Sequence, residues 1–248
     1  MPWVHAVIFD SDGTLVDSEV PGLDALHGFC LRQGLNLSRE LAHRQFRGVS
    51  LQVCMAWVAA QLDAPVGGVP TPERVSALTA GARAAMNERF HQGLSAMPGA
   101  DDLLAQLARS ALPFCVGTNG PRQKVELALS LAGLRRHFAD EHLFSAYEVG
   151  SFKPEPGLFL HAAAALGVPA AHCAVVEDSL PGVQAGLAAG MQVFCLHPRE
   201  GMPPELVQRV VFIAHLAELA RWLPVTAPRL ESHAKGCPLG AATSGVSR

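Results

Sequence analysis

The stretch VIFDSDGTLVDSE, residues 7–19, decides how the rest of the sequence is interpreted. An apolar run over residues 6–9 leads directly into Asp10, Ser11 and Asp12. The run is typical of a buried β-strand, whereas two carboxylates so close together repel each other. A chain that ends a buried strand with both acids therefore needs a partner that offsets their charge.

Composition indicates a globular protein and excludes several classes of partner. Of 248 residues, 49% are apolar and 17% are charged, which suits one large domain or two modest ones. The net charge of -3, without a basic block, argues against nucleic acid or an anionic membrane as partner. No apolar run has the length of a membrane helix, and we expect no signal peptide. Six cysteines without a CxxC pair suggest a reducing compartment, so we expect a cytoplasmic protein, by default a monomer.

Short apolar runs alternate with helix-like patterns over most of the chain. The expected strands are residues 4–9, 113–117, 142–145, 173–176 and 192–196. Apolar positions recur at helical spacing between them, in residues 100–111, 123–133, 157–167 and 182–190. This alternation predicts an α/β fold: a Rossmann-like parallel sheet with helices on both faces.

One long segment breaks the alternation. Residues 18–92 are almost entirely helix-like, with a Gly/Pro-rich loop at 64–72. We expect them to form an all-α cap domain inserted after the first strand, with hinges near 15–17 and 92–96. The core domain would then comprise 1–17 and 93–224. The remainder, 225–248, has little apolar periodicity and is expected to be a disordered tail.

Polar residues follow three of the expected strands. Carboxyl ends of parallel strands share one edge of a sheet, where such folds bind ligands. A single acid there could equally cap a helix, but acids after two strands favour a hard divalent cation such as Mg²⁺. The side chains expected to converge are Asp10, Asp12, Thr118, Asn119, Glu177 and Asp178.

Other residues suit a phosphate group. Thr118 offers a hydroxyl, and the helix that follows Gly120 opens with free amides that can hold an anion. Lys153, in the segment GSFKPEP, could neutralise a phosphate oxygen. An ordinary loop lysine is the alternative for Lys153, although the chain has only three lysines.

Four segments together resemble the motifs of the haloacid dehalogenase superfamily of phosphohydrolases. They are DSDGTLVDSE, CVGTNG, FKPEP and VVEDSLPGVQAGLAAGM, in the order that the family has them. The helical insert resembles the cap of the phosphoglucomutase-like, sugar-phosphate phosphatase branch. This resemblance implies Mg²⁺ as cofactor and a small phosphorylated metabolite as partner.

The resemblance also implies a role for each motif residue. Asp10 would be the nucleophile that forms an aspartyl phosphate, and Asp12 the general acid and base, with its backbone carbonyl on Mg²⁺. Asp178 would bind the metal directly, and Glu177 directly or through water. The phosphoryl oxygens would be held by Thr118, Asn119 and Lys153, and Gly13 would leave room for the turn and the substrate.

The cap loop separates branches of the family. Arg47 and Gly48 resemble the loop that faces the site, although Arg47 is equally consistent with a solvated arginine at a helix end. Phosphomutases of this branch usually carry a histidine where this chain has Gly22, and an arginine where it has Leu51. Both departures weaken a mutase interpretation.

The leading hypothesis is therefore a magnesium-dependent phosphatase for a sugar phosphate or a sugar-acid phosphate such as 6-phosphogluconate. A sugar phosphomutase is the alternative. A non-enzymatic binding or regulatory protein is a remote one, because none of the four motifs is broken.

Overall fold

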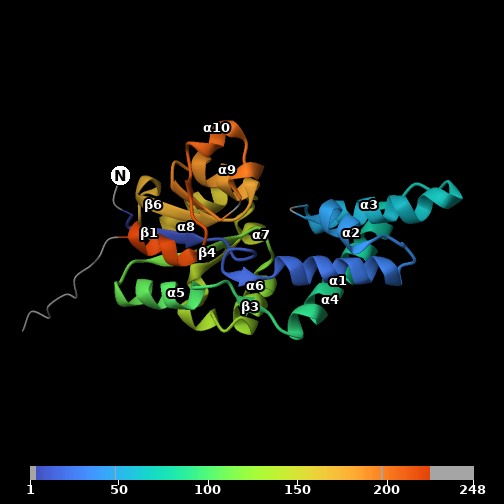
Figure 1. Cartoon of the computed structure of the whole chain (residues 1–248), viewed down its shortest axis with the longest axis horizontal. Coiled ribbons are helices and arrows are strands. Elements are labelled where there is room, and N and C mark those ends of the chain that lie inside the picture. Colours follow the sequence, from blue (N-terminus) through green and yellow to red (C-terminus); the bar gives the residue numbers. More distant parts are fainter. Residues whose placement is uncertain (1–3, 48, 197, 224–248) are drawn as a thin grey trace, which may run out of the picture.

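A six-stranded parallel sheet forms the centre of the larger part of the molecule (Figure 1). The computed structural model describes residues 4–47, 49–196 and 198–223. Neighbouring strands follow the order β5-β4-β1-β6-β7-β8, and every pair is parallel. The strands are β1 (Ala6–Phe9), β4 (Phe114–Thr118), β5 (Leu143–Ser145), β6 (Cys173–Glu177), β7 (Gln192–Cys195) and β8 (Val211–Phe212).

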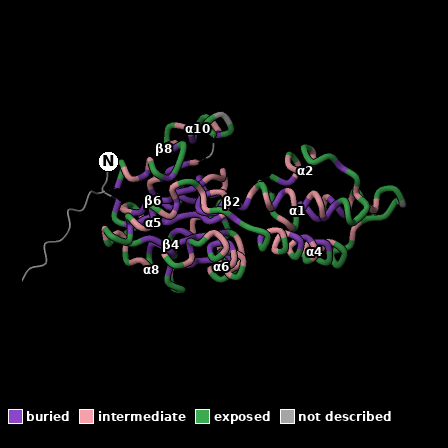
Figure 2. The backbone as a smooth tube through the Cα atoms, turned by 60° about the horizontal axis from the view of Figure 1, so that its bottom comes forward, coloured by how far each residue is buried: buried purple, intermediate pink, exposed green. Residues whose placement is uncertain are grey.

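Helices cover both faces of this sheet, because the central strand is apolar on both sides. Val7 and Phe9 of β1 join one buried cluster with α5 (Ala100–Arg109) and α6 (Arg122–Leu131). Ala6 and Ile8 point to the opposite face and join a second cluster with α8 (Gly157–Ala165) and α9 (Leu180–Ala188). The expected α/β class is confirmed, and the burial along the strands is visible in Figure 2.

Four helices lie together beside the sheet and have a core of their own (Figure 1). They are α1 (Glu19–Arg32), α2 (Arg39–Phe46), α3 (Leu51–Asp63) and α4 (Pro72–His91). Side chains such as Leu26, Phe46, Met55 and Leu78 are buried among these helices rather than against the sheet. Ser38, Ser50 and Thr71 cap three of the helices by accepting hydrogen bonds from backbone amides.

A small antiparallel ribbon joins the helical part to the sheet. β2 (Val16–Asp17) leaves the core and β3 (Ser95–Ala96) returns to it, with Val16 opposite Ala96. These strands lie in the two segments that we expect to be hinges. The ribbon therefore holds side by side the two segments through which the chain passes between the sheet and the helical part.

Several short elements have no clear signal in the sequence. They are α7 (Ala146–Val149), α10 (Pro204–Val207) and 3-10 turns at Ala64–Val66, Arg135–His137, Asp140–His142, Ala170–His172, Arg199–Gly201 and Leu216–Arg221. None of the helices in the described ranges is both long and apolar enough to cross a membrane. The expected tail, 225–248, lies outside the described residues.

Candidate active site

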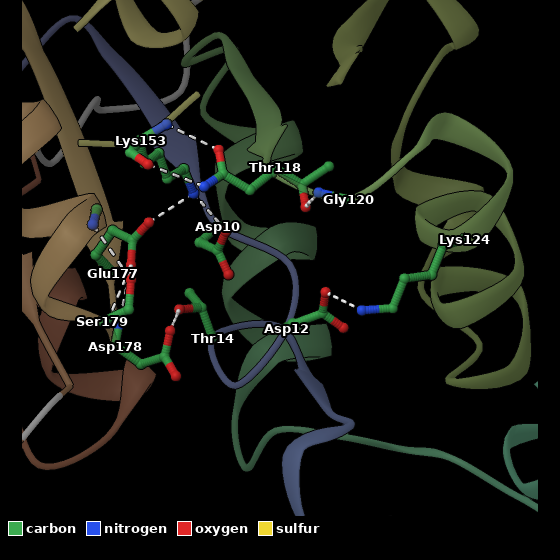
Figure 3. A network of polar contacts seen from close by, with 12 residues as sticks. Asp10, Asp12, Thr14, Thr118, Gly120, Lys124, Lys153, Glu177, Asp178 and Ser179 are labelled. Atoms are coloured by element: carbon green, nitrogen blue, oxygen red, sulfur yellow. Dashed lines mark hydrogen bonds and ion pairs between the residues drawn. The ribbon is translucent and has the colours of Figure 1, made fainter. Parts of the chain in front are cut away.

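The polar residues that follow β1, β4 and β6 meet at one edge of the sheet (Figure 3). β1 lies between the other two strands, with Phe9 opposite both Val116 and Val176. The residues directly after or at these strand ends therefore become neighbours, as parallel topology requires. Asp10 is buried there although it carries a carboxylate.

Lys153 lies between two carboxylates. Its ammonium donates to an oxygen of Asp10 and to Oε1 of Glu177, at 2.6 Å for the latter. The side chain of Lys153 is only 3% exposed. Burial disfavours the ammonium, but the two carboxylates outweigh it and raise the pKa of Lys153 above its usual value. Lys153 is thus a fixed positive charge inside the site.

Glu177 is held at both carboxylate oxygens. Oε2 accepts hydrogen bonds from the backbone amides of Asp178 and Ser179, both at 3.1 Å, and from the Ser179 hydroxyl at 2.9 Å. The backbone of Gly182 lies so close that a Cβ there would stand 1.8 Å from Oε1 of Glu177. The first turn of α9 therefore depends on a glycine to accommodate this buried acid.

Three carboxylates form a compact acidic cluster. Asp10, Glu177 and Asp178 each offer an oxygen, and these oxygens all lie within 4.8 Å of one another. Burial, together with the charges of Glu177 and Asp12, raises the pKa of Asp10 to about 7 against the opposing effect of Lys153. Burial and the charge of Asp10 also raise the pKa of Asp178 well above its usual value.

The acidic cluster fits a divalent cation. All its donors are oxygens, which hard cations prefer. Burial first, and then the neighbouring carboxylates, raise the pKa values of Asp10 and Asp178, and a cation would offset both effects. Gly13 lies against this cluster, and a Cβ there would stand 2.0 Å from Oδ2 of Asp178. Thr14 orients the same carboxylate, because its hydroxyl donates to Oδ1 of Asp178 at 3.3 Å.

Asp12 lies outside the acidic cluster and points away from it (Figure 3). Its Oδ2 accepts from Lys124 Nζ at 2.6 Å, and its Oδ1 accepts from the Ser18 hydroxyl at 2.6 Å. Burial opposes ionisation, yet these two donors bring the pKa of Asp12 below its usual value. Sequence reasoning missed both partners; the scarcity of lysine was the one signal for Lys124.

The loop after β4 is ordered by its own side chains. The hydroxyl of Thr118 accepts a hydrogen bond from the Gly120 amide at 3.0 Å. The side chain of Asn119 binds the backbone of Lys153, accepting from its N–H at 2.9 Å and donating to its carbonyl at 3.2 Å. Asn119 therefore fixes the loop that carries Lys153, in addition to any contact with a phosphate.

Of the two cap-loop residues expected to contact the substrate, Arg47 is described and Gly48 lies outside the described residues. Arg47 forms an ion pair with Glu19 in the first turn of α1. Its side chain is 53% exposed, so it is accessible to a ligand. The roles expected for Arg47 and Gly48 in substrate binding stay predictions.

The two positions that depart from the phosphomutase pattern have apolar surroundings. Gly22 is buried, and a Cβ there would stand 3.2 Å from Cε of Met86, with Phe90 next to it. A histidine at this position would have to displace both side chains. Leu51 packs against the core of the helical part and offers no donor to an anion.

Comparison with known proteins identifies the family. The model of the haloacid dehalogenase-like hydrolases matches residues 4–190. This protein is a haloacid dehalogenase-like hydrolase. The match spans the acidic cluster, both lysines of the site and the helical part.

Individual proteins of known name or structure are also similar to this chain. 6-phosphogluconate phosphatase of Escherichia coli (strain K12) is 34% identical over 221 residues, which are 88% of this chain and 94% of that protein. Hexitol phosphatase A of the same organism is 32% identical over 79% of this chain and 84% of its own length. A family hydrolase of Deinococcus radiodurans R1, solved with bound phosphate and sodium, is 31% identical with a TM-score of 0.65, covering 88% of this chain and 94% of that one.

Proposed function

We propose that this hydrolase is a magnesium-dependent phosphatase for a small phosphorylated metabolite, a sugar phosphate or a sugar-acid phosphate such as 6-phosphogluconate. The observation that carries the proposal is the acidic cluster of Asp10, Glu177 and Asp178 beside the buried ammonium of Lys153. Such a site combines oxygen ligands for a cation with a fixed positive charge for a phosphoryl group. The similarity to 6-phosphogluconate phosphatase and hexitol phosphatase A supports the substrate class.

The metal would be held by the carboxylates of Asp10 and Asp178, by Glu177 directly or through water, and by the backbone carbonyl of Asp12. When bound, Mg²⁺ supplies positive charge that neutralises the transferring phosphoryl group. Lys153, which contacts both Asp10 and Glu177, supplies a second positive charge. The Thr118 hydroxyl and the amides of its loop would hold the remaining phosphoryl oxygens.

The proposed reaction has two steps. In the first, a carboxylate oxygen of Asp10 attacks phosphorus, the ester P–O bond breaks, and the departing oxygen takes a proton from Asp12. In the second, water attacks the aspartyl phosphate and gives a proton back to Asp12, while the P–O bond to Asp10 breaks. Inorganic phosphate and the alcohol are the products, and both aspartates return to their initial state.

The helical part would act as the cap of this site. We infer that residues 18–92 form the cap domain and that 1–17 and 93–224 form the catalytic domain. A cap excludes stray water from the aspartyl phosphate and contacts the non-phosphate end of the substrate. Arg47, which is exposed and forms an ion pair with Glu19, and Gly48 are the candidates for that contact.

Release of phosphate from a panel of phosphate esters, with and without Mg²⁺, tests the proposal. One sugar phosphate or sugar-acid phosphate should be strongly preferred in kcat/KM, and Asp10→Asn should release phosphate from it about 10³-fold more slowly or not at all. Release that persists in Asp10→Asn, or without a divalent metal, contradicts the mechanism. Binding of the ester without turnover by the wild type would favour a non-enzymatic protein.

A mutase should instead need a bisphosphate activator and lose little phosphate to water. The apolar surroundings of Gly22 and Leu51 argue against it, because neither position has a donor for a second phosphate. We also propose that the protein is a cytoplasmic monomer with no nucleic-acid partner; gel filtration of the purified chain tests its oligomeric state.

A further inference from the structure

Lys124 connects two of the motif loops. It lies in the first turn of α6, and its aliphatic stem runs beside Gly120, where a Cβ would stand 3.5 Å from Lys124 Cδ. From there Nζ reaches Oδ2 of Asp12 at 2.6 Å (Figure 3). One side chain thus joins the loop after β4 to the loop after β1. None of the roles proposed above uses it.

The carboxylate of Asp12 is restrained at both oxygens by residues from different elements. Ser18 binds Oδ1 and Lys124 binds Oδ2, each at 2.6 Å. Ser18 stands at the N-cap of α1, yet its side chain makes no capping hydrogen bond there. Its hydroxyl donates to Asp12 instead. Two contacts on opposite oxygens fix the plane of the carboxylate as well as its position.

We propose that Lys124 is a positioning residue for Asp12: it holds the carboxylate in the orientation in which Asp12 exchanges protons with the leaving oxygen and with water. The inference rests on the proposed function. An ammonium can only donate, so Nζ keeps its hydrogen bond to Oδ2 whether Asp12 is neutral or charged. The proton that Asp12 gives and recovers is then carried on Oδ1, whose partner, the Ser18 hydroxyl, can turn from donor to acceptor.

A purely structural role is the competing interpretation. The side chains of Lys124 and Asp12 are 23% and 32% exposed, and partly exposed ion pairs contribute only about 0–1 kcal/mol to stability. Asp12 is the proposed general acid and base, and Lys124 contacts its carboxylate directly. Loss of Lys124 should therefore affect the reaction much more than the fold.

Two phosphate esters separate these interpretations. The aryl group of p-nitrophenyl phosphate leaves as a stable anion and needs no proton, whereas an alkyl ester such as 6-phosphogluconate needs one. For both esters kcat/KM covers the steps up to release of the leaving group. Lys124→Met should lower kcat/KM at least about tenfold more for the alkyl ester, as expected when proton transfer contributes roughly 10²–10⁴-fold to a rate. Lys124→Arg should recover part of the loss.

Controls make the result specific. Gln123 is exposed on the same helix, and Gln123→Met should leave both esters unchanged. The thermal midpoint of Lys124→Met should match that of Gln123→Met; if Lys124→Met does not fold, Lys124→Gln takes its place. Equal losses with both esters, or no loss with either, overturn the inference.

Asp12→Asn distinguishes failure of this inference from failure of the proposed function. It should show the same preference for the aryl ester, more strongly than Lys124→Met. If Asp12→Asn shows that preference and the Lys124 variants do not, Lys124 is not a positioning residue. If Asp12→Asn turns over the alkyl ester normally, the proposed role of Asp12 is itself wrong.

Discussion

Gly182 offers a sharp test of how the buried acid is held. Gly→Ala inside a helix normally stabilises a protein by about 0.5–1 kcal/mol, because alanine loses less chain entropy on folding. In α9 the opposite should occur. The added Cβ would stand 1.8 Å from Oε1 and 1.9 Å from Cδ of Glu177. Glu177 is fully buried, so its carboxylate cannot swing into solvent and must leave Lys153.

The expected magnitude follows from the contacts that are lost. Breaking a buried ion pair on one side destabilises a protein by about 3–5 kcal/mol. After the helix gain of about 1 kcal/mol is subtracted, Gly182→Ala should be about 2–4 kcal/mol less stable than wild type. For a chain of this size each kcal/mol lowers the melting temperature by about 2–4 °C. The loss should therefore be roughly 4–16 °C.

A matched substitution supplies the control. Gly28 lies inside α1, and a Cβ there would meet only Arg32 Nη1 at 3.5 Å, an ordinary contact distance. Gly28→Ala should therefore be neutral or slightly stabilising in the same calorimetric and urea experiments. Two identical chemical changes, both at helical glycines, should shift stability in opposite directions.

A double-mutant cycle with Glu177→Ala isolates the cause. If the Cβ acts only through the carboxylate, Gly182→Ala should add no further destabilisation once that carboxylate is absent. Gly182→Ala protein that melts at or above the wild-type temperature would refute the reasoning. So would full additivity in the cycle, because the clash would then lie elsewhere.

Three further changes probe the acidic cluster. Asp10→Asn should lower phosphate release by about 10³-fold or more, since it removes the proposed nucleophile; a phosphate-release assay with Mg²⁺ measures this. Gly13→Ala should weaken Mg²⁺ binding at least about tenfold in calorimetric titration. Its Cβ would stand 2.0 Å from Oδ2 of Asp178, and its positive φ of 81° strains any residue with a side chain. Unchanged affinity would show that Gly13 does not shape the acidic cluster. The raised pKa of Asp10, about 7, means that the metal-free fold binds more protons than the unfolded chain between about pH 4 and 7, so its stability should fall as pH rises through that window. Melting curves at pH 5.5 and 8 should show this fall in wild type relative to Asp10→Asn. Added Mg²⁺ should raise the melting temperature more at pH 8 than at pH 5.5. A wild-type melting temperature that rises toward pH 8 relative to Asp10→Asn would contradict the raised pKa of Asp10.

The parallel sheet, and the meeting of the motif residues at one of its edges, could both be predicted from the sequence. Each central strand is a run of apolar residues that ends in a polar pair, and parallel topology brings such ends to one edge. Asp10 and Glu177 are neighbours for this reason alone, although 166 residues separate them. The sheet edge strand β8 was missed because two residues, Val211 and Phe212, carry no periodicity.

Side-chain partners were harder to predict than backbone positions. Lys153 was expected to meet a phosphate, and the structure adds that Asp10 and Glu177 share its ammonium. The Lys124–Asp12 contact depends on the direction in which one helical side chain leaves α6. That direction is set by how α6 packs on the sheet, which local sequence does not encode.

The two aspartates of the opening motif illustrate how neighbours assign roles to identical residues. Asp10, buried beside Glu177, has a raised pKa, whereas Asp12, bound by Lys124 and Ser18, has a lowered one. The proposed reaction needs the reverse at its start: an ionised Asp10 to attack and a protonated Asp12 to assist. A cation beside Asp10 favours its carboxylate, and a phosphate dianion beside Asp12 favours its protonated form. Metal and substrate together would therefore bring both aspartates into their reactive states, while either one alone leaves the site incomplete.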